Sequence, residues 1–346
     1  MSGEREVLNA YASDENGNIN ADGKHTTLVL AVSPNKPIAS PIQYFRGSGN
    51  NWVDYKLTVI NTATQNIWNK EVYRDFPLIN QFDLTGKYTH KDVTMSYASF
   101  SPKKSMAKAP LLIWLHGGGE GGTDPLIPII GNRAANYASE EIQSIFEGAY
   151  VLAPQCPGAW MHNKSGSSTH GEEDDIYNEG LMALIENYVN THPGIDKNRI
   201  YLGGCSNGGY MTLKLILKHP SYFTAGFISS LAYQSEYITD DQIASIKNVP
   251  LWFVHSKDDK TTLAEKTVIP VYNRLKAAGA SDLYFSFYDH VKDITGVYGG
   301  DNFSYNGHWS WVYLHANECR LDIDGKPVKV NNIPVNIMQW LSFQKK

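Results

Sequence analysis

The sequence predicts an α/β protein with a doubly wound, mostly parallel sheet, preceded by a small all-β sandwich domain. Residues 26–100 contain several short strand-like segments and no helical pattern, whereas after about residue 105 short apolar runs alternate with helical segments. Strands that are apolar throughout and alternate with helices indicate a parallel sheet covered on both faces. We therefore divide the chain into a β-rich domain at residues 1–100 and an α/β domain at residues 101–346.

The strand-like segments of the first hundred residues follow one another at short spacing. Residues 26–32 (TTLVLAV) and 52–60 (WVDYKLTVI) are rich in β-branched and aromatic residues. In the second segment, alternate residues from Val53 to Val59 share one face by the two-residue period of a strand. Short strands with turn residues between them are typical of a sandwich. A last segment, residues 93–100, either closes this domain or opens the next one.

The second part of the chain contains six apolar runs of strand length, at residues 110–116, 150–154, 199–204, 225–230, 250–256 and 283–289. Segments with a helical period lie between them. In residues 174–190, for example, Ile176, Leu181 and Leu184 fall on one face of a predicted helix. Because parallel sheets place their functional residues at the carboxyl ends of the strands, the residues that follow each run are the first candidates for a site.

Composition and charge narrow the class of partner. Of 346 residues, 42% are apolar and 19% charged, and the formal net charge is −5 without a basic run. This balance argues against a nucleic acid or an anionic membrane as partner. The apolar stretches, such as residues 109–115, are too short to cross a bilayer. The first 13 residues lack the apolar core of a signal peptide, which predicts a cytoplasmic protein, or a secreted one if the natural start has been replaced. The oligomeric state is not predicted.

The sequence predicts no metal site and no cofactor. The three cysteines, Cys156, Cys205 and Cys319, are too few and too widely spaced for a disulfide framework or a set of metal ligands. The acidic residues 14–23 (DENGNINADG) lack the glycine and the glutamate that a calcium loop places at its sixth and twelfth positions. We interpret this segment as a hairpin turn or a loose terminus.

A glycine-rich segment, Gly204-Cys205-Ser206-Asn207-Gly208, follows one strand and precedes a helix. G-x-S-x-G in this setting is the signature of a nucleophile elbow, a sharp turn that presents a strained serine. The glycines are needed because strand and helix press close together on either side of the turn. The helix also directs its positive N-terminal end towards the hydroxyl. The alternative to an elbow is a glycine-rich connection that contains a serine by chance. Cys205 is not at the centre of the pattern, and we predict that it is a packed residue.

A serine hydroxyl needs a base to become a nucleophile. In proteins with such an elbow, an acid and then a histidine follow the serine along the chain. Asp258 and Asp259 come directly after an apolar run, and we prefer Asp259, which lies one step further into the loop. His308 lies in a loop before an apparent helix, from which it can reach Ser206. His315 would lie inside that helix and is predicted to be a packed residue.

The segment HGGGEGG follows another strand of the predicted sheet. Glycines let the main chain curl closely enough to aim its N–H groups at a developing oxyanion. We predict that backbone N–H groups of this loop, together with that of Asn207, form such an oxyanion hole. A phosphate-binding loop is the alternative, but the segment lacks G-x-x-x-x-G-K-[ST], and Glu120 would repel an anion. His116 and Glu120 are predicted to hold the loop in shape.

These segments resemble α/β-hydrolase esterases of the phospholipase/carboxylesterase and polyhydroxybutyrate-depolymerase-like group, in particular bacterial esterases with an N-terminal immunoglobulin-like domain. The resemblance rests on LHGGGEGGTD (115–124), VLAPQCP (151–157), GGCSNGGYM (203–211), VHSKDD (254–259) and GHWSW (307–311). It implies that Ser206 is the nucleophile, His308 the base and Asp259 the orienting acid. It also makes Gly118, Gly119 and Asn207 the expected oxyanion donors. The family often has an arginine where this chain has Gly121, so the ion pair that would stiffen the loop is not expected here.

The resemblance and the order of the motifs imply a serine carboxylesterase that works through an acyl-enzyme intermediate without a metal or cofactor. The expected substrate is a small-molecule or oligosaccharide ester with a short acyl chain or a sugar or aromatic group. Trp160 and Trp309 are candidates for substrate contact, and ordinary packing is the alternative for both. Three other functions stay open: a serine peptidase of the prolyl-oligopeptidase type, a polyester depolymerase, and a binding module fused to a vestigial hydrolase.

Overall fold

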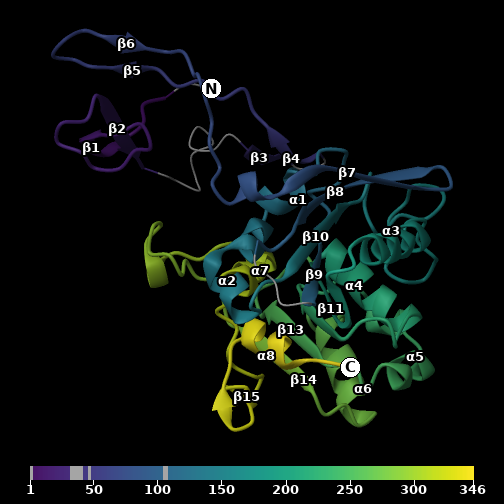
Figure 1. Cartoon of the computed structure of the whole chain (residues 1–346). Helices are drawn as coiled ribbons and strands as arrows, with labels where there is room; N and C mark the ends of the chain where they lie inside the picture. Colours follow the sequence, from purple (N-terminus) through teal and green to yellow (C-terminus); the bar gives the residue numbers. More distant parts are fainter. Residues whose placement is uncertain (1–2, 32–41, 46–47, 104–107) are drawn as a thin grey trace. The chain divides into compact units, whose positions relative to one another are not determined.

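The computed structural model describes residues 3–31, 42–45, 48–103 and 108–346 (Figure 1). The chain forms two compact units. One consists of Met1–Arg74 and Lys292–Phe303, and the other of Asp75–Val291 and Ser304–Lys346.

This division differs from the predicted boundary at residue 100. The strands β7 (Asp83–His90) and β8 (Val93–Phe100) belong to the larger unit, because β8 pairs with β10 (Tyr150–Gln155) in its sheet. Residues 93–100 therefore open the second unit rather than close the first. The smaller unit also takes in Lys292–Phe303, far along the chain, which the local sequence pattern did not indicate.

The smaller unit is an antiparallel β domain. Its described strands form three separate pairs: β1 (Val7–Ser13) with β2 (His25–Leu30), β3 (Ile42–Phe45) with β4 (Gly49–Trp52), and β5 (Val59–Ile60) with β6 (Ile67–Trp68). Residues 14–23 form the predicted turn, between β1 and β2. The predicted strand at 26–32 is present up to Leu30, and Val32 lies outside the described residues. The predicted strand at 52–60 is wrong in extent, because its two ends pair in different hairpins and residues 53–58 pair in neither.

The larger unit is built on an eight-stranded sheet (Figure 1). Its order is β14 (Leu283–Tyr288), β13 (Leu251–Ser256), β12 (Ala225–Ser229), β11 (Ile195–Cys205), β9 (Ala109–Leu115), β10, β8 and β7. Neighbours from β14 to β10 are parallel, and β8 and β7 are added antiparallel. The six apolar runs of the second part are the six parallel strands, so the predicted mostly parallel sheet is confirmed.

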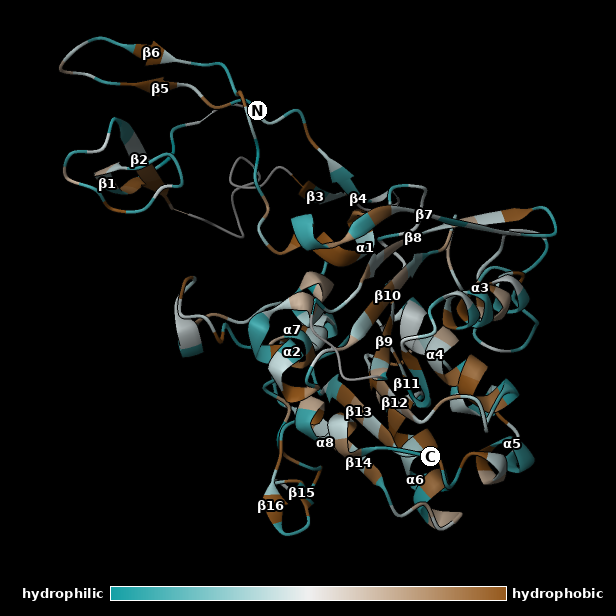
Figure 2. Ribbon diagram, viewed as in Figure 1, coloured by the Kyte–Doolittle hydropathy of each residue, from teal (hydrophilic) through white to brown (hydrophobic). Residues whose placement is uncertain are grey.

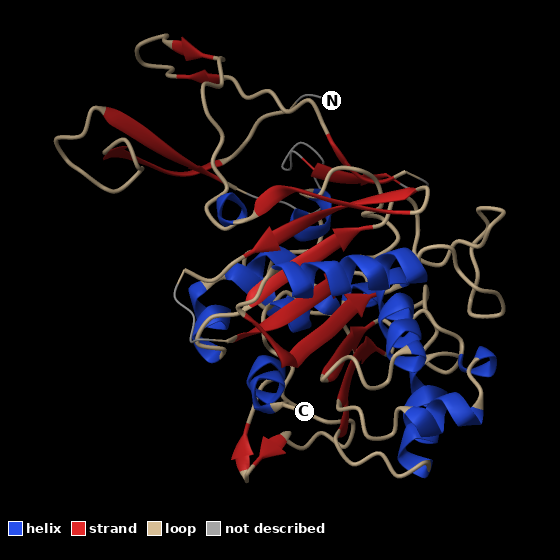
Figure 3. Ribbon diagram, turned by 45° about the vertical axis from the view of Figure 1, so that its right-hand side comes forward, coloured by secondary structure: helices blue, strands red, loops and turns tan. Residues whose placement is uncertain are grey.

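Helices cover both faces of this sheet, as Figure 3 shows. Along β9, Leu111 and Ile113 face one buried cluster, and Leu112 and Trp114 face the other. The first cluster includes residues of α3 (Asn178–Thr191), α4 (Asn207–Lys218), α5 (Asp240–Ser245) and α6 (Val268–Ala277). The second includes residues of α1 (Ile127–Ile130), α2 (Glu140–Ile145), α7 (Trp311–His315) and α8 (Ile337–Phe343). The chain also forms a small hairpin of β15 (Lys329–Val330) and β16 (Ile333–Pro334).

The helix predicted at residues 174–190 begins later than expected. Asp175 Oδ1 accepts the N–H of Asn178 at 3.0 Å, so α3 starts at Asn178 and ends at Thr191. Ile176, which the helical pattern placed on the buried face, precedes the helix and is exposed. Within the described residues, no helix has both the length and the apolar character needed to span a bilayer.

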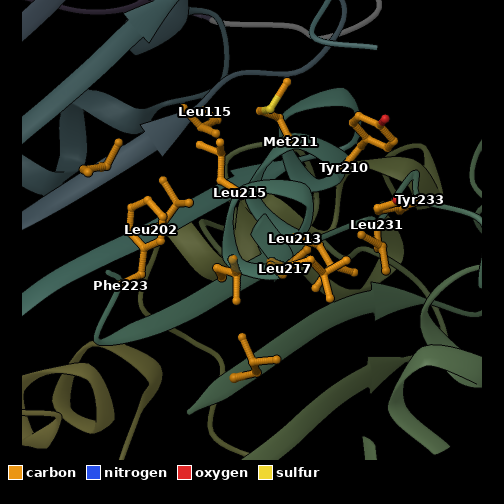
Figure 4. Close-up of a cluster of buried hydrophobic side chains, with 14 of the residues drawn as sticks. Leu115, Leu202, Tyr210, Met211, Leu213, Leu215, Leu217, Phe223, Leu231 and Tyr233 are labelled. Atoms are coloured by element: carbon orange, nitrogen blue, oxygen red, sulfur yellow. The ribbon is translucent and has the colours of Figure 1, made fainter. Parts of the chain in front are cut away.

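Helix α4 begins directly after Ser206 and is buried from Asn207 to Leu217. Its apolar side chains belong to one buried cluster with Leu202 of β11 and Leu231 of the loop after β12 (Figure 4). The α4 members drawn there are Tyr210, Met211, Leu213, Leu215 and Leu217. In Figure 2, brown segments mark hydrophobic residues along strands of the sheet. Each fully buried leucine stabilises the fold by about 2 kcal/mol. This packing fixes the N-terminal end of α4, where Ser206 lies.

Candidate active site

Ser206 lies at a sharp turn between β11 and α4. Its backbone has φ 54° and ψ −116°, a conformation that non-glycine residues rarely adopt and that costs about 1–3 kcal/mol. A Cβ at Gly204 would lie 2.5 Å from the carbonyl oxygen of Gly208, and one at Gly208 would lie 2.0 Å from that of Leu115. Only glycine fits at these two positions, so the structure has the elbow that the G-x-S-x-G segment predicts.

The structure brings the three predicted triad residues together. Ser206 Oγ lies 2.9 Å from His308 Nε2, and His308 Nδ1 lies 2.8 Å from Asp259 Oδ2. His308 is buried in a short turn before α7, and Asp259 is buried in the loop after β13. Because Nδ1–H donates to the carboxylate, the ring keeps its proton on Nδ1, and Nε2 is free to accept the serine proton.

The carboxylate of Asp259 is held by more than its histidine. Oδ1 accepts the N–H groups of Thr261 at 2.8 Å and Thr262 at 3.0 Å, and Oδ2 accepts the hydroxyl of Thr262 at 2.7 Å. Burial alone would raise the pKa of Asp259. The hydrogen bond and charge of His308, with the donors from Thr262, instead lower this pKa to about 2. The group is therefore an anion throughout the neutral range.

Asp258, the other acid that the sequence left open, has different partners. Its Oδ1 accepts the hydroxyl of Ser256, and its Oδ2 accepts His290 Nδ1 at 2.8 Å. A Cβ at Gly307 would lie 2.2 Å from Asp258 Oδ1, so this side chain packs against the residue before His308. The geometry thus favours the predicted acid, Asp259, and gives Asp258 a role in supporting the loop.

The predicted oxyanion donors come from two neighbouring segments. A Cβ at Gly118 would lie 3.8 Å from the Cβ of Asn207, so the glycine loop after β9 lies beside the start of α4. Among the described residues, the backbone N–H groups of Gly118 and Asn207 have no hydrogen-bond acceptor. Gly118 is exposed, and Gly119, the other predicted donor of the loop, is half-buried. The site therefore has backbone donors available next to Ser206.

His116 ties the glycine loop to the end of β10. Its Nε2 accepts the N–H of Cys156 at 3.0 Å, and its Nδ1 donates to the carbonyl of Gly117 at 2.6 Å. Burial lowers the pKa of His116 to about 4, so the ring is neutral and carries its proton on Nδ1. The predicted structural role of this histidine agrees with these bonds.

Trp160 lies differently from the prediction. Its side chain is fully buried, and its indole N–H donates to the carbonyl of His116 at 3.1 Å. Its backbone N–H donates to Asn207 Oδ1 at 2.6 Å. Trp160 therefore offers a substrate no surface, because it packs beneath the glycine loop. Asn207 also uses its side chain, whereas the sequence assigned a role only to its backbone.

Two other side chains are sequence neighbours of triad residues. Trp309, beside His308, is 41% exposed, and its ring lies 6.1 Å from that of Tyr305, so it remains available to a substrate. Cys205 is fully buried, and its sulfur accepts Asn132 Nδ2 at 3.7 Å. Burial raises the pKa of the Cys205 thiol, so it is no rival to Ser206 as nucleophile.

Two family models match the chain. The esterase immunoglobulin-like N-terminal domain matches residues 1–74, and the phospholipase/carboxylesterase family matches residues 100–280. The chain belongs to the phospholipase/carboxylesterase family. Its larger unit has the α/β-hydrolase fold, which confirms the resemblance inferred from the sequence.

Several known proteins are similar to this family member. Feruloyl esterase B of Neurospora crassa is 33% identical over 128 residues, which are 37% of this chain and 41% of that protein. A probable carboxylesterase SOBER1-like of Arabidopsis thaliana is 26% identical over 199 residues, 51% of this chain and 70% of that protein. The chain spans less than half the length of the two feruloyl esterases it matches. The crystal structure of a thermostable esterase matches the whole chain and 89% of its own, with a TM-score of 0.74 and 22% identity.

The glycine loop shows why this phospholipase/carboxylesterase family member has no arginine at position 121. A Cβ at Gly121 would lie 1.9 Å from the carbonyl oxygen of Gly158, so the loop after β9 packs directly on the loop after β10. The N–H of Gly122 also donates to the carbonyl of Cys156 at 2.8 Å. This backbone contact between the two loops holds the glycine loop in place. It does so without the ion pair that an arginine at position 121 would form.

Two residues beside the acid, Thr262 and His255, were not predicted as part of the site. Thr262 is buried and donates twice to Asp259, from its amide and from its hydroxyl. His255 lies on β13, also buried, with Nε2 3.3 Å from Asp259 Oδ2. The spacing of His255 and Thr262 around the acid, four residues before and three after, is the only sequence signal for either one.

Proposed function

We propose that the protein is a serine carboxylesterase. The observation that carries this proposal is the continuous arrangement of Ser206, His308 and Asp259, with contacts of 2.9 and 2.8 Å, at a strained elbow beside unused backbone N–H groups. A serine activated by a buried histidine–carboxylate pair next to such donors is the arrangement that acyl transfer requires. Membership of the phospholipase/carboxylesterase family supports an ester as the substrate.

In the acylation step, Ser206 Oγ attacks the ester carbonyl carbon while His308 Nε2 takes the hydroxyl proton. Asp259 stabilises the resulting imidazolium. The negative charge that develops on the carbonyl oxygen is bound by the N–H groups of Gly118 and Asn207, and each such donor contributes about 3 kcal/mol to the transition state. The imidazolium then gives its proton to the leaving alcohol oxygen, which breaks the ester bond and leaves an acyl-serine.

In the deacylation step, a water molecule attacks the carbonyl carbon of the acyl-serine and gives a proton to His308. The same backbone donors stabilise the second oxyanion. When this intermediate collapses, the proton returns to Ser206 Oγ, and the carboxylic acid leaves. Apart from the ester and the attacking water, these steps use side chains and backbone groups of this chain.

Ser206→Ala tests the proposal directly. We expect this variant to keep its fold and lose hydrolysis of p-nitrophenyl acetate and labelling by a fluorophosphonate probe, since only an activated serine reacts with the probe. Ser165→Ala is the matched control, because Ser165 is an exposed serine in the loop after β10. Normal hydrolysis by Ser206→Ala would rule out the proposed mechanism.

Aromatic acyl esters are the substrate class that we propose first. Trp309 presents an exposed ring next to His308, and two similar proteins are named feruloyl esterase B. A ring that stacks on the acyl group would favour aromatic over short aliphatic acids. We expect Trp309→Ala to raise KM for methyl ferulate several-fold and to leave hydrolysis of p-nitrophenyl acetate nearly unchanged. Acetylated sugars should be assayed beside methyl ferulate and p-nitrophenyl acetate, because an oligosaccharide ester is also a candidate substrate.

Three measurements separate the alternatives. A serine peptidase of the prolyl-oligopeptidase type would cleave peptide amides as well as esters, although such enzymes carry a larger N-terminal domain than residues 1–74. A polyester depolymerase would clear suspensions of polymer. A binding module fused to a vestigial hydrolase would not react with the fluorophosphonate probe, and the intact contacts of Ser206 argue against it.

A further inference from the structure

His255 is a second histidine beside the predicted acid, and the proposed mechanism does not use it. It lies on β13, four residues before Asp259, and its side chain is fully buried. Its Nε2 donates to the carbonyl of Thr262 at 2.8 Å and lies 3.3 Å from Asp259 Oδ2. The ring is thus turned towards the acid rather than towards the serine.

Thr262 connects this histidine with the carboxylate. Its carbonyl accepts from His255, its hydroxyl donates to Asp259 Oδ2 at 2.7 Å, and its N–H donates to Asp259 Oδ1 at 3.0 Å. The three residues therefore form one hydrogen-bonded turn. Loss of the bond from His255 would free the carbonyl of Thr262 and loosen the residue that fixes both oxygens of the acid.

The protonation of His255 suits this position. Burial lowers the pKa of His255, so the ring is neutral. Its proton lies on Nε2, since that nitrogen faces a carbonyl, while Nδ1 has no partner among the described residues. The charged or titratable groups near the ring are Asp259, His308 and Glu265. The positive end of the Nε2–H dipole therefore points at the side of the acid that also binds His308.

We propose that His255 is a positioning residue for Asp259: it holds the turn at Thr262 and helps to stabilise the carboxylate that orients His308. This inference rests on the proposed esterase function, because it assigns a role within the same triad. Its closest structural alternative is a histidine that only fills space beneath the loop after β13.

The two roles differ in what they do to the pH dependence of the reaction. Without the donor, the Asp259 carboxylate is less stabilised and holds the imidazolium of His308 more strongly. The base then keeps its proton to higher pH, so the acidic limb of kcat/KM moves upward, by about 0.5 to 1 pH unit. A histidine that only fills space would, when replaced, lower stability without moving this limb.

The experiment measures kcat/KM for p-nitrophenyl acetate from pH 5 to 9 with the full chain and its variants. We expect His255→Leu to show the upward shift and a several-fold loss of kcat/KM at pH 7. His255→Gln, whose amide can donate to Thr262, should restore the limb to within about 0.2 unit of the wild type. His315→Leu removes another fully buried histidine and should leave the limb in place.

The outcomes separate this inference from the proposed function. An unshifted limb in His255→Leu, or the same shift in His255→Gln, would overturn the positioning role while leaving the esterase assignment intact. Absence of any turnover by the wild type would overturn both. If His255→Leu does not fold, His255→Asn takes its place, because its shorter amide does not reach the carbonyl of Thr262, and the same shift is expected.

Discussion

Asp258 and Asp259 are adjacent in the chain, yet their carboxylates bind different histidines. Asp258 Oδ2 lies 2.8 Å from His290 Nδ1, and Asp259 Oδ2 lies 2.8 Å from His308 Nδ1. The side chain of His290 is 55% exposed, whereas that of His308 is 11% exposed and that of Asp259 is fully buried. Attraction between charges is much stronger away from water, so only the second pair is suited to stabilise a transient imidazolium.

Exchange of each aspartate for asparagine tests this difference. Asp259→Asn should lower kcat by about 10⁴-fold, because an amide neither stabilises the imidazolium nor selects the correct tautomer of His308. Asp258→Asn is the matched control, since it has the same shape and a neighbouring position, and it should keep kcat within a few-fold of the wild type. Steady-state hydrolysis of p-nitrophenyl acetate measures both. A larger loss in Asp258→Asn than in Asp259→Asn would contradict the assignment.

The side chain of Asn207 gives a second prediction. Asn207→Ala leaves the backbone N–H of Trp160 buried without its acceptor, which should lower the free energy of unfolding by about 1–3 kcal/mol. Asn207→Asp keeps an acceptor at the same place and should retain most of the stability. Its negative charge, however, lies next to the developing oxyanion and should lower kcat. Urea unfolding measures the first effect, and equal stability of Asn207→Ala and the wild type would argue against the contact.

The sequence predicted the parallel sheet and the triad because both depend on local signals. An apolar run of strand length indicates a strand that is buried on both faces. Gly204 and Gly208 indicate that the backbone segments around a sharp turn lie too close together for a side chain. The order of serine, acid and histidine then left two choices open, Asp258 or Asp259 as the acid and His308 or a neighbouring histidine as the base. The contacts favour Asp259 and His308 through partners that are distant in the sequence.

Features that depend on tertiary contacts could not be predicted in this way. Trp160 lies in a polar segment, which suggested an exposed ring, but the glycine loop after β9 covers it and supplies an acceptor for its indole. The grouping of Lys292–Phe303 with the smaller unit is likewise set by contacts rather than by composition. His255 resembles any histidine at the end of a buried strand until the fold brings Thr262 to its Nε2.

The close packing of the two loops predicts the effect of a single methyl group. Gly121→Ala should destabilise the protein by about 1–3 kcal/mol and lower kcat, because its Cβ would overlap the carbonyl of Gly158 and displace the oxyanion loop. Gly180→Ala is the matched control. Its Cβ would lie 3.5 Å from the Met95 side chain, and α3 gains helix propensity, so its stability should equal or exceed that of the wild type. Thermal unfolding and esterase assays of the two variants measure the difference.

Buried neutral histidines predict how stability depends on pH. Burial lowers the pKa of His116 to about 4 and that of His315 to about 3, and both start from 6.5. Between about pH 6.5 and 4 the unfolded chain therefore binds protons that the folded chain excludes. Stability should fall as the pH decreases through this window, by up to about 1.4 kcal/mol per pH unit for each histidine. Asp259 acts in a separate window, because its stabilisation is present above about pH 4 and is lost as the pH falls towards 2.

Urea unfolding of the wild type and of His315→Leu between pH 7.5 and 4.5 measures this dependence. His315 is fully buried against Trp114 and Tyr137, so the variant should lose one of the linked protons and show a slope smaller by about 1.4 kcal/mol per pH unit. His170→Leu, at an exposed histidine, should leave the slope unchanged. If His315→Leu and the wild type have the same slope, His315 is already protonated in the folded protein and its burial does not govern acid stability.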